Sequence, residues 1–205
     1  TVYRRFGKRL GDVTLALLTL TVLSPLIALV ALLIKLTSRG PVFYVQERIG
    51  KAGVPFRFIK FRTMVVGAET HGAGILCLKN DPRVTAVGRL IRRFSLDELA
   101  QLINVLRGEM SVVGPRPGLD YQVKEYTPDQ RRRLTVLPGI TGWAQVNGRN
   151  AINWDERIKR DLEYVERVSP RMDLLVLCGT LGAIVRSDAL IAAIEESKKQ
   201  PLKAA

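Results

Sequence analysis

The chain has 205 residues, enough for one domain with a hydrophobic core, or for a small domain together with a membrane element. Its 32 lysines and arginines against 19 acids give a formal net charge of +13, which predicts anionic partners such as nucleic acid, an acidic lipid surface or phosphate-bearing substrates. Aromatic residues make up only 6% and do not alternate with the basic ones, which disfavours binding of single-stranded nucleic acid. The two cysteines and the single histidine form no metal-binding motif, which disfavours a zinc site or a disulfide framework.

The first predicted element is an uncharged apolar segment, residues 13–34. As a helix it would rise about 33 Å, enough to cross a bilayer. Ser24 and Pro25 interrupt it near its midpoint, where proline removes a helical hydrogen bond, and the carbonyl that is freed needs a partner such as the Ser24 hydroxyl. Both flanks are basic, so the charge distribution indicates no single orientation. A kinked span and a helix that enters the membrane, bends and returns both remain open on this pattern.

The segments that follow predict a mixed domain of helices and strands. Strands at Val42–Gln46 and Phe56–Phe61, around a Gly-Lys-Ala-Gly turn, predict a β-hairpin. Apolar residues then recur at helical spacing from Val84 to Phe94, with arginines that include Arg92 on the other face. This basic amphipathic helix suits either an anionic membrane surface or the solvated face of a domain helix.

The next predicted helix carries two adjacent acids near its start. Ser95 and Glu98 fit a capping box, with Ser95 at the N-cap and Glu98 three residues later, and Gly108 ends the helix. Asp97 falls in the first turn, where the helix dipole favours a carboxylate and helps to keep it ionised. Taken by itself, the acid pair is explained by helix geometry.

Two glycine-rich loops follow, and each contains an arginine. The segment at 114–118, GPRPG, holds Arg116 between two prolines, which suits a bidentate grip on phosphate. The segment at 137–150 adds amide side chains and Arg149. Together with the acid pair, these loops predict a diphosphate-and-metal site, with acids for Mg²⁺ and arginines for phosphoryl oxygens. A last apolar run, at 173–186, is too short to cross a membrane and predicts a core or interfacial helix.

These motifs together resemble the bacterial sugar transferases, a family of monotopic polyprenol-phosphate phosphoglycosyltransferases. The resemblance covers almost the whole chain to about Asp188. The segments that carry it are KRLGD at 8–12, SPL at 24–26, GPVFYVQERIG at 40–50, FRFIKFRTM at 56–64, VGRLIRRFSLDELAQLINVLRGEMSVVGPRP at 87–117, LPGITGWAQVNGRN at 137–150 and the region from Asp161 to Leu174.

The resemblance implies a reaction. A UDP-sugar would donate its phosphosugar to polyprenol (undecaprenyl) phosphate, giving polyprenol-diphosphosugar and UMP at the start of glycan assembly. Asp97 is expected to be the nucleophile that attacks the β-phosphorus and forms an aspartyl-phosphosugar in a ping-pong cycle, and Glu98 is expected to bind Mg²⁺ with it. The residues expected to bind substrate are Lys60, Arg92, Arg116 and Arg149, with Asp161 and Asp173 as further candidates.

The resemblance also implies an α+β fold: a mostly helical small domain with a short β-hairpin, interfacial amphipathic helices and a re-entrant membrane hairpin broken at Ser24 and Pro25. We expect residues 1–39 to form the membrane element, 40–188 a catalytic domain on the cytoplasmic face of the bacterial inner membrane, and 189–205 a polar tail. The expected partners are the donor, the acceptor and membrane lipids, without nucleic acid. The alternative is a membrane-tethered basic module that binds anionic lipid or nucleic acid without catalysis, in which the acids only cap a helix.

Overall fold

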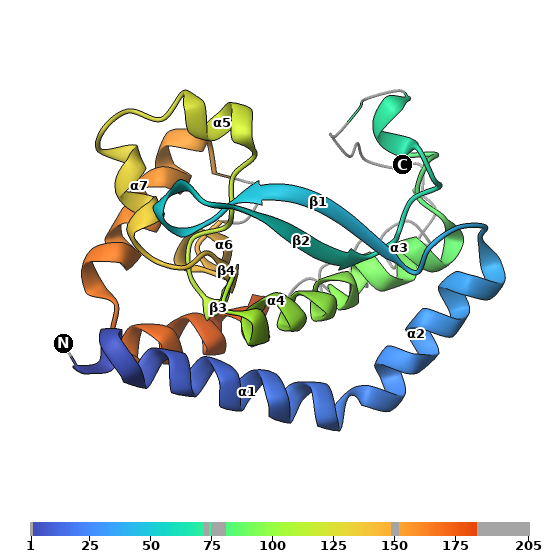
Figure 1. The fold of residues 1–205 in the computed structure, drawn as a ribbon, viewed down its shortest axis with the longest axis horizontal. Coiled ribbons are helices and arrows are strands. Elements are labelled where there is room, and N and C mark those ends of the chain that lie inside the picture. The colour runs from blue at the N-terminus through green and yellow to red at the C-terminus, as the bar shows by residue number, and fades with distance from the viewer. Residues whose placement is uncertain (1, 72–73, 75–80, 149–151, 184–205) are drawn as a thin grey trace, which may run out of the picture.

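The computed structural model describes residues 2–71, 74, 81–148 and 152–183. It is a mixed fold of helices and strands, mostly helical, with two small two-stranded sheets (Figure 1). The predicted polar tail at 189–205 lies outside the described residues, and so does Arg149. The predicted division of the chain into three parts stays a prediction.

Two helices that meet at a sharp bend form the N-terminal part of the molecule. The helical segments Tyr3–Val22, which contains α1 (Lys8–Val22), and Ser24–Thr37, which is α2, are bent by 65° relative to each other. Pro25 leaves the carbonyl of Thr21 without its usual helical partner, and the Ser24 hydroxyl donates to that oxygen at 2.8 Å. Among the described residues no single helix is long and apolar enough to cross a membrane, but this bent pair meets the length and composition together.

The predicted hairpin is present and extends further toward its turn than expected. Strand β1 (Phe43–Ile49) pairs antiparallel with β2 (Pro55–Phe61). In Figure 1 this hairpin runs across the upper part of the molecule, and α1 runs along the bottom. The register places three cross-strand pairs on one face of the hairpin: Tyr44 with Lys60, Gln46 with Phe58, and Arg48 with Phe56.

Three helical segments follow the hairpin. Helix α3 spans Ala86–Arg93, and the Thr85 hydroxyl caps its start by accepting a hydrogen bond from the Gly88 N–H at 2.9 Å. The single helix predicted next is divided into a 3₁₀ helix, Leu96–Gln101, and the short α-helix α4, Leu102–Arg107. The acid pair therefore lies in a 3₁₀ helix.

The predicted capping box of Ser95 and Glu98 is wrong. Ser95 has a left-handed backbone, with φ of 55°, and its side chain makes no capping hydrogen bond. The Glu98 carboxylate instead accepts hydrogen bonds from Lys60 and Arg116. Bonds from two cations are stronger than one bond from a backbone N–H, so they determine where the Glu98 side chain lies. The prediction that Gly108 ends the helix is confirmed, and its φ is 82°.

A second small sheet joins the two glycine-rich loops. Strands β3 (Ser111–Val113) and β4 (Gly139–Thr141) pair in parallel, and beyond β3 the Gly114 N–H donates to the Thr141 carbonyl at 2.9 Å. A Cβ on Gly139 would collide with the Gly114 nitrogen, so this close approach requires glycine. The sequence did not predict this pairing, which holds the loop that carries Arg116 against the second loop.

The remaining helices lie at one end of the hairpin, around β3 and β4 (Figure 1). One hydrophobic cluster surrounds Val105 and Val176 and joins β2, α4 and β3 to the C-terminal helices. A second cluster, around Ile34 and Phe61, packs α2 against β2 and α3. The helices not yet given are α5 (Asp120–Lys124), α6 (Trp143–Val146), α7 (Trp154–Arg167), a helix at 170–183, and short turns at Tyr3–Gly7, Lys51–Gly53, Ala68–Thr70 and Gln130–Thr135.

Candidate active site

Asp97 and Glu98 lie beside two basic side chains that come from other elements. The Lys60 ammonium, on β2, is 3.5 Å from an Asp97 carboxylate oxygen and 3.1 Å from a Glu98 carboxylate oxygen. The Arg116 guanidinium, in the loop after β3, donates to the same Glu98 oxygen at 2.8 Å. The fold thus brings together four of the residues that the sequence assigned to the site.

The two carboxylates have opposite pKa shifts. Burial of Glu98 would raise its pKa, but Arg116 and Lys60 outweigh burial and lower the pKa to about 2. Asp97 is only 9% exposed, and burial raises its pKa, while Lys60 opposes this effect and the negative charge of Glu98 adds to it. From the sequence we expected the start of the helix to keep Asp97 ionised. In the structure, burial outweighs any such effect and the pKa of Asp97 is raised. Glu98 is a fixed anion, whereas Asp97 is a poorly solvated carboxylate.

Arg92 lies near Asp97 at the end of α3. Its Nε donates to the Thr63 hydroxyl at 2.7 Å, and its positive charge acts against the raised pKa of Asp97. The fourth expected phosphate-binding residue, Arg149, lies outside the described residues.

Arg48 is a further basic residue of this region, and the sequence analysis did not select it. Its Nε and Nη2 donate to the Gln46 side-chain oxygen at 3.1 and 2.8 Å, and its Nη1 donates to the Pro117 carbonyl at 3.3 Å. Burial and the nearby charge of Arg116 lower its pKa. The signal in the sequence was the alternation of β1, which puts Arg48 on the same face as Gln46.

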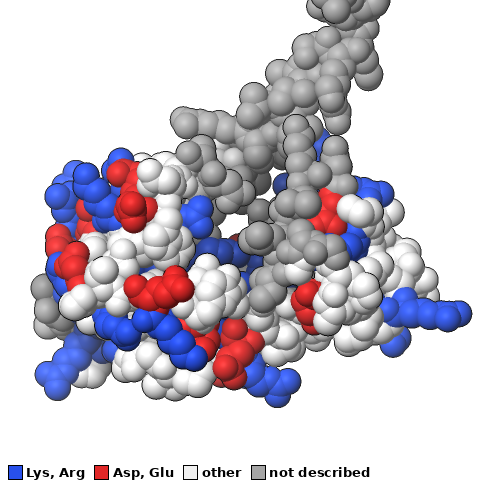
Figure 2. All heavy atoms as spheres, turned by 90° about the horizontal axis from the view of Figure 1, so that it is seen from above, with Lys and Arg blue, Asp and Glu red and all other residues white. Residues whose placement is uncertain are grey.

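Charges of both signs meet around the acid pair, with positive charge in excess. Lys60, Arg92 and Arg116 act on the two acids, and Arg48 lies near Arg116. Such a site favours an anionic substrate. Figure 2 shows that the face of the molecule opposite α1 is hollowed and that Lys and Arg side chains are visible inside the hollow.

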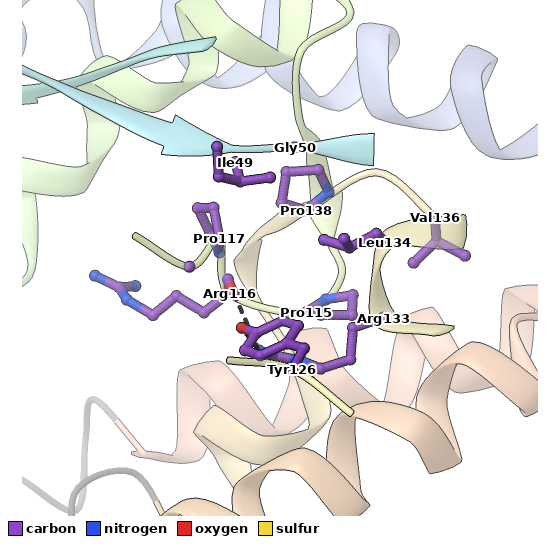
Figure 3. Close-up of a pocket in the computed structure, with 11 residues that line it drawn as sticks. Ile49, Gly50, Pro115, Arg116, Pro117, Tyr126, Arg133, Leu134, Val136 and Pro138 are labelled. Carbon is purple, nitrogen blue, oxygen red and sulfur yellow. Dashed lines mark hydrogen bonds between the residues drawn. The ribbon is translucent and has the colours of Figure 1, made fainter. Parts of the chain in front are cut away.

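Asp161, an expected substrate-binding residue, lies behind the loop that carries Arg116. It is 1% exposed and pairs with Arg133 at 2.5 Å. Arg133 also donates to the Arg116 carbonyl at 3.2 Å and to the Tyr126 hydroxyl at 2.5 Å. Figure 3 shows the Arg116 side chain pointing away from Arg133 and Tyr126. Arg116, Tyr126 and Arg133 help to line a cavity of about 10 Å³, room for roughly one water molecule.

Asp173, the other candidate for substrate binding, lies in a buried polar cluster that joins the N-terminal helix to the C-terminal helices. It accepts hydrogen bonds from the Lys8 ammonium at 2.7 Å, from the Tyr164 hydroxyl at 2.6 Å and from the Tyr3 hydroxyl. Within the described residues, this cluster shares no hydrogen bond or ion pair with the acid pair.

The expected Mg²⁺ would have few protein ligands. Among the described residues, no group of three or more His, Cys, Asp or Glu side chains is placed to hold a metal. Mg²⁺ often takes one or two carboxylates and completes its shell with substrate phosphates and water. The Lys60 ammonium contacts oxygens of both Asp97 and Glu98, so the two carboxylates converge on one point and attract positive charge there. The acid pair therefore fits Mg²⁺ in combination with phosphate oxygens of a bound substrate.

A large apolar surface lies on the bent helix pair. Exposed apolar patches of this kind mark sites of protein or membrane interaction. The helix at 170–183 adds Leu174 and Leu181, which are 61% and 67% exposed. On α1 and α2 the residues that are at least half exposed are Leu10, Leu17, Leu18, Val22, Leu29, Leu32 and Leu36.

Comparison with known proteins shows extended similarity. The model of a family described as bacterial sugar transferase matches residues 3–187. The chain is 44% identical over 183 residues to the uncharacterized sugar transferase EpsL of Bacillus subtilis, covering 89% of each protein. It is 39% identical over 195 residues to the exopolysaccharide production protein ExoY of Sinorhizobium fredii, covering 88% of this chain and 86% of that one. It is 42% identical over 181 residues to the UDP-glucose:undecaprenyl-phosphate glucose-1-phosphate transferase of Escherichia coli, covering 84% of this chain but 39% of that protein.

Proposed function

Because the chain belongs to the bacterial sugar transferase family, we propose that it transfers a sugar phosphate from a UDP-sugar to undecaprenyl phosphate, releasing UMP and starting the assembly of a glycan. The Escherichia coli relative is a UDP-glucose:undecaprenyl-phosphate glucose-1-phosphate transferase, which supports this choice of donor and acceptor. The observation that carries the proposal is the acid pair, Asp97 and Glu98, held against Lys60 and Arg116 in a region of excess positive charge.

The reaction has two half-reactions, and Asp97 takes part in both. In the first, its ionised carboxylate attacks the β-phosphorus of the donor, an oxygen–phosphorus bond forms, and the bond to the bridging oxygen breaks, so that UMP leaves with the electron pair. In the second, a phosphate oxygen of the polyprenol phosphate attacks the same phosphorus. The bond to Asp97 then breaks, which restores the carboxylate and releases polyprenol-diphosphosugar.

The neighbouring residues position the phosphates and balance their charge. Lys60 contacts both acids, and Arg116 contacts Glu98, so phosphoryl oxygens that bind between Asp97 and these cations meet donors that are already fixed. Glu98, ionised at all working pH values, keeps the two cations in place. When Mg²⁺ is bound, Asp97 and Glu98 would hold it, and it would neutralise charge on the phosphates.

The test of this mechanism is Asp97→Asn. Purified protein with Mg²⁺, a panel of UDP-sugars and polyprenol phosphate is expected to release UMP, and the variant is expected to lose at least about a thousandfold in turnover, because the nucleophile is removed. Asp120→Asn, at an exposed acid on α5, is the matched control and should retain full activity. Near-normal turnover of Asp97→Asn would show that no covalent aspartyl step occurs.

The alternative function, a membrane-tethered basic module, makes the opposite predictions. Such a protein would bind anionic vesicles or nucleic acid with a steep dependence on salt, and Asp97→Asn would leave that binding unchanged. It would release no UMP from any UDP-sugar.

We further propose that the bent helix pair enters the cytoplasmic membrane and returns to the same face, so that the acid pair lies at the level of the lipid headgroups. The exposed leucines of α1 and α2, and the Thr21 carbonyl that Ser24 satisfies at the bend, support this arrangement. Single cysteines at Val2 and Arg39, in a variant without Cys77 and Cys178, test it. In cells, an impermeant thiol reagent should reach neither site until the membrane is permeabilised. Labelling of one site alone from outside would instead indicate a helix that spans the membrane.

A further inference from the structure

Arg48 is a partly buried arginine, and its hydrogen-bond partners among the described residues are all neutral. A guanidinium has five N–H groups, and three of those on Arg48 are bound to the Gln46 side-chain oxygen and the Pro117 carbonyl. Two N–H groups remain, and within the described residues Arg48 makes no ion pair with an acid. A buried charge without a counter-ion is costly, so this arrangement favours an anion supplied from outside the chain.

The surroundings of Arg48 hold its guanidinium in a fixed place near Arg116. Its guanidinium and the Lys60 ammonium lie 5.6 and 5.5 Å from the centroid of the same buried ring, Phe58. Its bond to the Pro117 carbonyl ties it to the residue directly after Arg116. Burial lowers the pKa of Arg48, and the nearby positive charge of Arg116 lowers it further. An arginine held so tightly is already ordered for a ligand.

The basic residues of the site differ in what they are paired with. Lys60 contacts both acids and Arg116 contacts Glu98, so these two cations surround the position where a phosphorus would be attacked by Asp97. Within the described residues Arg48 has no acid partner, so no carboxylate balances its positive charge as Glu98 balances those of Lys60 and Arg116. A UDP-sugar brings two phosphoryl groups, and the one that is not attacked lies a single bridging oxygen away from the one that is.

We propose that Arg48, together with Arg116, binds the phosphate that leaves as UMP in the first half-reaction. This inference rests on the proposed function. Arg48 would donate its two remaining N–H groups to oxygens of that phosphate and would stabilise the negative charge that develops when the bond between the two phosphates breaks. The second half-reaction begins after UMP has left, so Arg48 has no part in it.

Steady-state kinetics separate the two half-reactions. In a ping-pong cycle, kcat/KM for the UDP-sugar reports only the first half-reaction, and kcat/KM for polyprenol phosphate reports only the second. Arg48→Met keeps the length of the apolar stem, and we expect it to lower kcat/KM for the donor by about 10²–10³-fold, with kcat/KM for the acceptor changed less than about twofold. Arg48→Lys should recover part of the loss, because it restores the charge without the planar fork.

The experiment needs a control variant and results that would contradict the inference. Arg57→Met, at an exposed arginine on the opposite face of the hairpin, should change neither constant. Equal losses of kcat/KM for donor and acceptor would overturn the inference. They would indicate that Arg48 only stabilises the loop that carries Arg116. An unchanged constant for the donor would overturn it as well. The Tm of Arg48→Met is measured together with that of Arg48→Lys, and the kinetic comparison is made with whichever variant keeps the Tm of the wild type.

Equilibrium binding of UMP tests the inference without turnover. Calorimetric titration of wild type with UMP and with uridine should give a difference in affinity that comes from the phosphate. We expect Arg48→Met to weaken UMP by at least about tenfold and to leave uridine unchanged, since a charge-assisted bidentate contact is lost. Unchanged affinity for UMP overturns the inference even if the enzyme is active. A wild type that binds UMP through Arg48 but releases none from a UDP-sugar would support the inference and contradict the proposed reaction.

Discussion

Asp97 and Glu98 are adjacent in the chain, yet their carboxylates are held in different ways. Glu98 accepts hydrogen bonds from Lys60 and Arg116, whereas within the described residues the Asp97 side chain accepts none. A carboxylate that is buried and weakly bound is more reactive than one that is fully hydrogen-bonded. The surroundings therefore distinguish the two carboxylates, which the sequence DE alone does not, and this difference supports the proposal that Asp97 is the nucleophile.

The raised pKa of Asp97 predicts the acid side of the pH profile. The first half-reaction needs the ionised form, so kcat/KM for the donor should fall as the pH drops through the pKa of Asp97, at a pH above about 3.9, the ordinary value for aspartate. Glu98, with a pKa of about 2, stays ionised throughout this range. Lys60→Met removes a charge that lowers the pKa of Asp97, so the acid limb should move to higher pH.

The measurement is a pH–rate profile of UMP release for the wild type and for Lys60→Met, at saturating acceptor. The position of the acid limb is read independently of the rate itself, which Lys60→Met also lowers. Arg57→Met serves as the control for loss of a positive charge on the same hairpin and should leave the limb in place. A limb at the same pH in all three proteins would mean that Asp97 is not the group that titrates.

At the scale of elements, one buried amide connects the hairpin to the helix that follows the acid pair. Asn104, on α4, is fully buried; its side-chain oxygen accepts from the Ile59 N–H at 3.1 Å and its amide donates to the Arg57 carbonyl at 2.7 Å. These bonds hold β2, and with it Lys60, against the helical segment that carries Asp97. The position of the Lys60 ammonium relative to the Asp97 carboxylate therefore depends on Asn104.

Asn104→Ala is expected to destabilise the fold, because it leaves the buried Ile59 N–H and the partly buried Arg57 carbonyl of β2 without their side-chain partner. Each such group costs about 1–3 kcal/mol, and about 2–4 °C of Tm per kcal/mol is expected for a chain of this size. Thermal unfolding of the purified protein measures the effect. Asn147→Ala, at an exposed asparagine, should shift the Tm by less than about 1–2 °C. Equal Tm values for the two variants would show that the Asn104 bonds add nothing to stability.

Local patterns in the sequence predicted those elements that are determined locally. The break at Pro25, the hairpin and the glycine at position 108 all follow from the conformational preferences of their own residues. The 3₁₀ helix at Leu96–Gln101 was missed, because cations that come from distant segments decide where the Glu98 side chain lies.

Contacts between distant segments were also beyond the sequence pattern. The parallel pairing of β3 with β4 joins segments that are separated by α5 and a long connection, and short three-residue strands give no periodic signal. Arg133 was missed for the same reason, since only the fold brings it to Asp161 and to the Arg116 carbonyl. That the acid pair and Arg116 lie together was predictable, because the motifs and the resemblance both point to these residues, while their roles stay predictions.

At the scale of the whole molecule, the bent helix pair is fastened to the rest of the chain at both ends. Arg9, near the start of α1, donates to the carbonyls of Val105 and Leu106 in the last turn of α4 at 2.5 and 3.0 Å. Arg62, directly after β2, donates to the carbonyls of Ser38 and Arg39 beyond α2. The apolar surface of the pair and the acid pair are thereby held in one fixed relation, so the depth of the helices in a membrane would set the depth of the site.

Asp173→Asn tests whether the polar cluster at the start of α1 is structural or binds substrate. In the structure, Asp173 accepts from Tyr3, Lys8 and Tyr164, and hydrogen bonds to a charged group are each worth about 1.5–3 kcal/mol. We expect the variant to lower the Tm by several degrees while the KM for the UDP-sugar stays the same. Asp120→Asn, which breaks an exposed ion pair with Lys124, should change the Tm little.

The opposite result would support the assignment of Asp173 from sequence. A KM for the donor raised at least about tenfold, with the Tm of the wild type, would mean that the carboxylate contacts substrate. The two outcomes are distinct because binding and stability are measured on the same preparation. The fraction of Asp173→Asn that sediments with membranes is measured as well. If it equals that of the wild type, the hydrogen bonds of Arg9 and Arg62 suffice to keep the helix pair attached when the cluster around Asp173 is weakened.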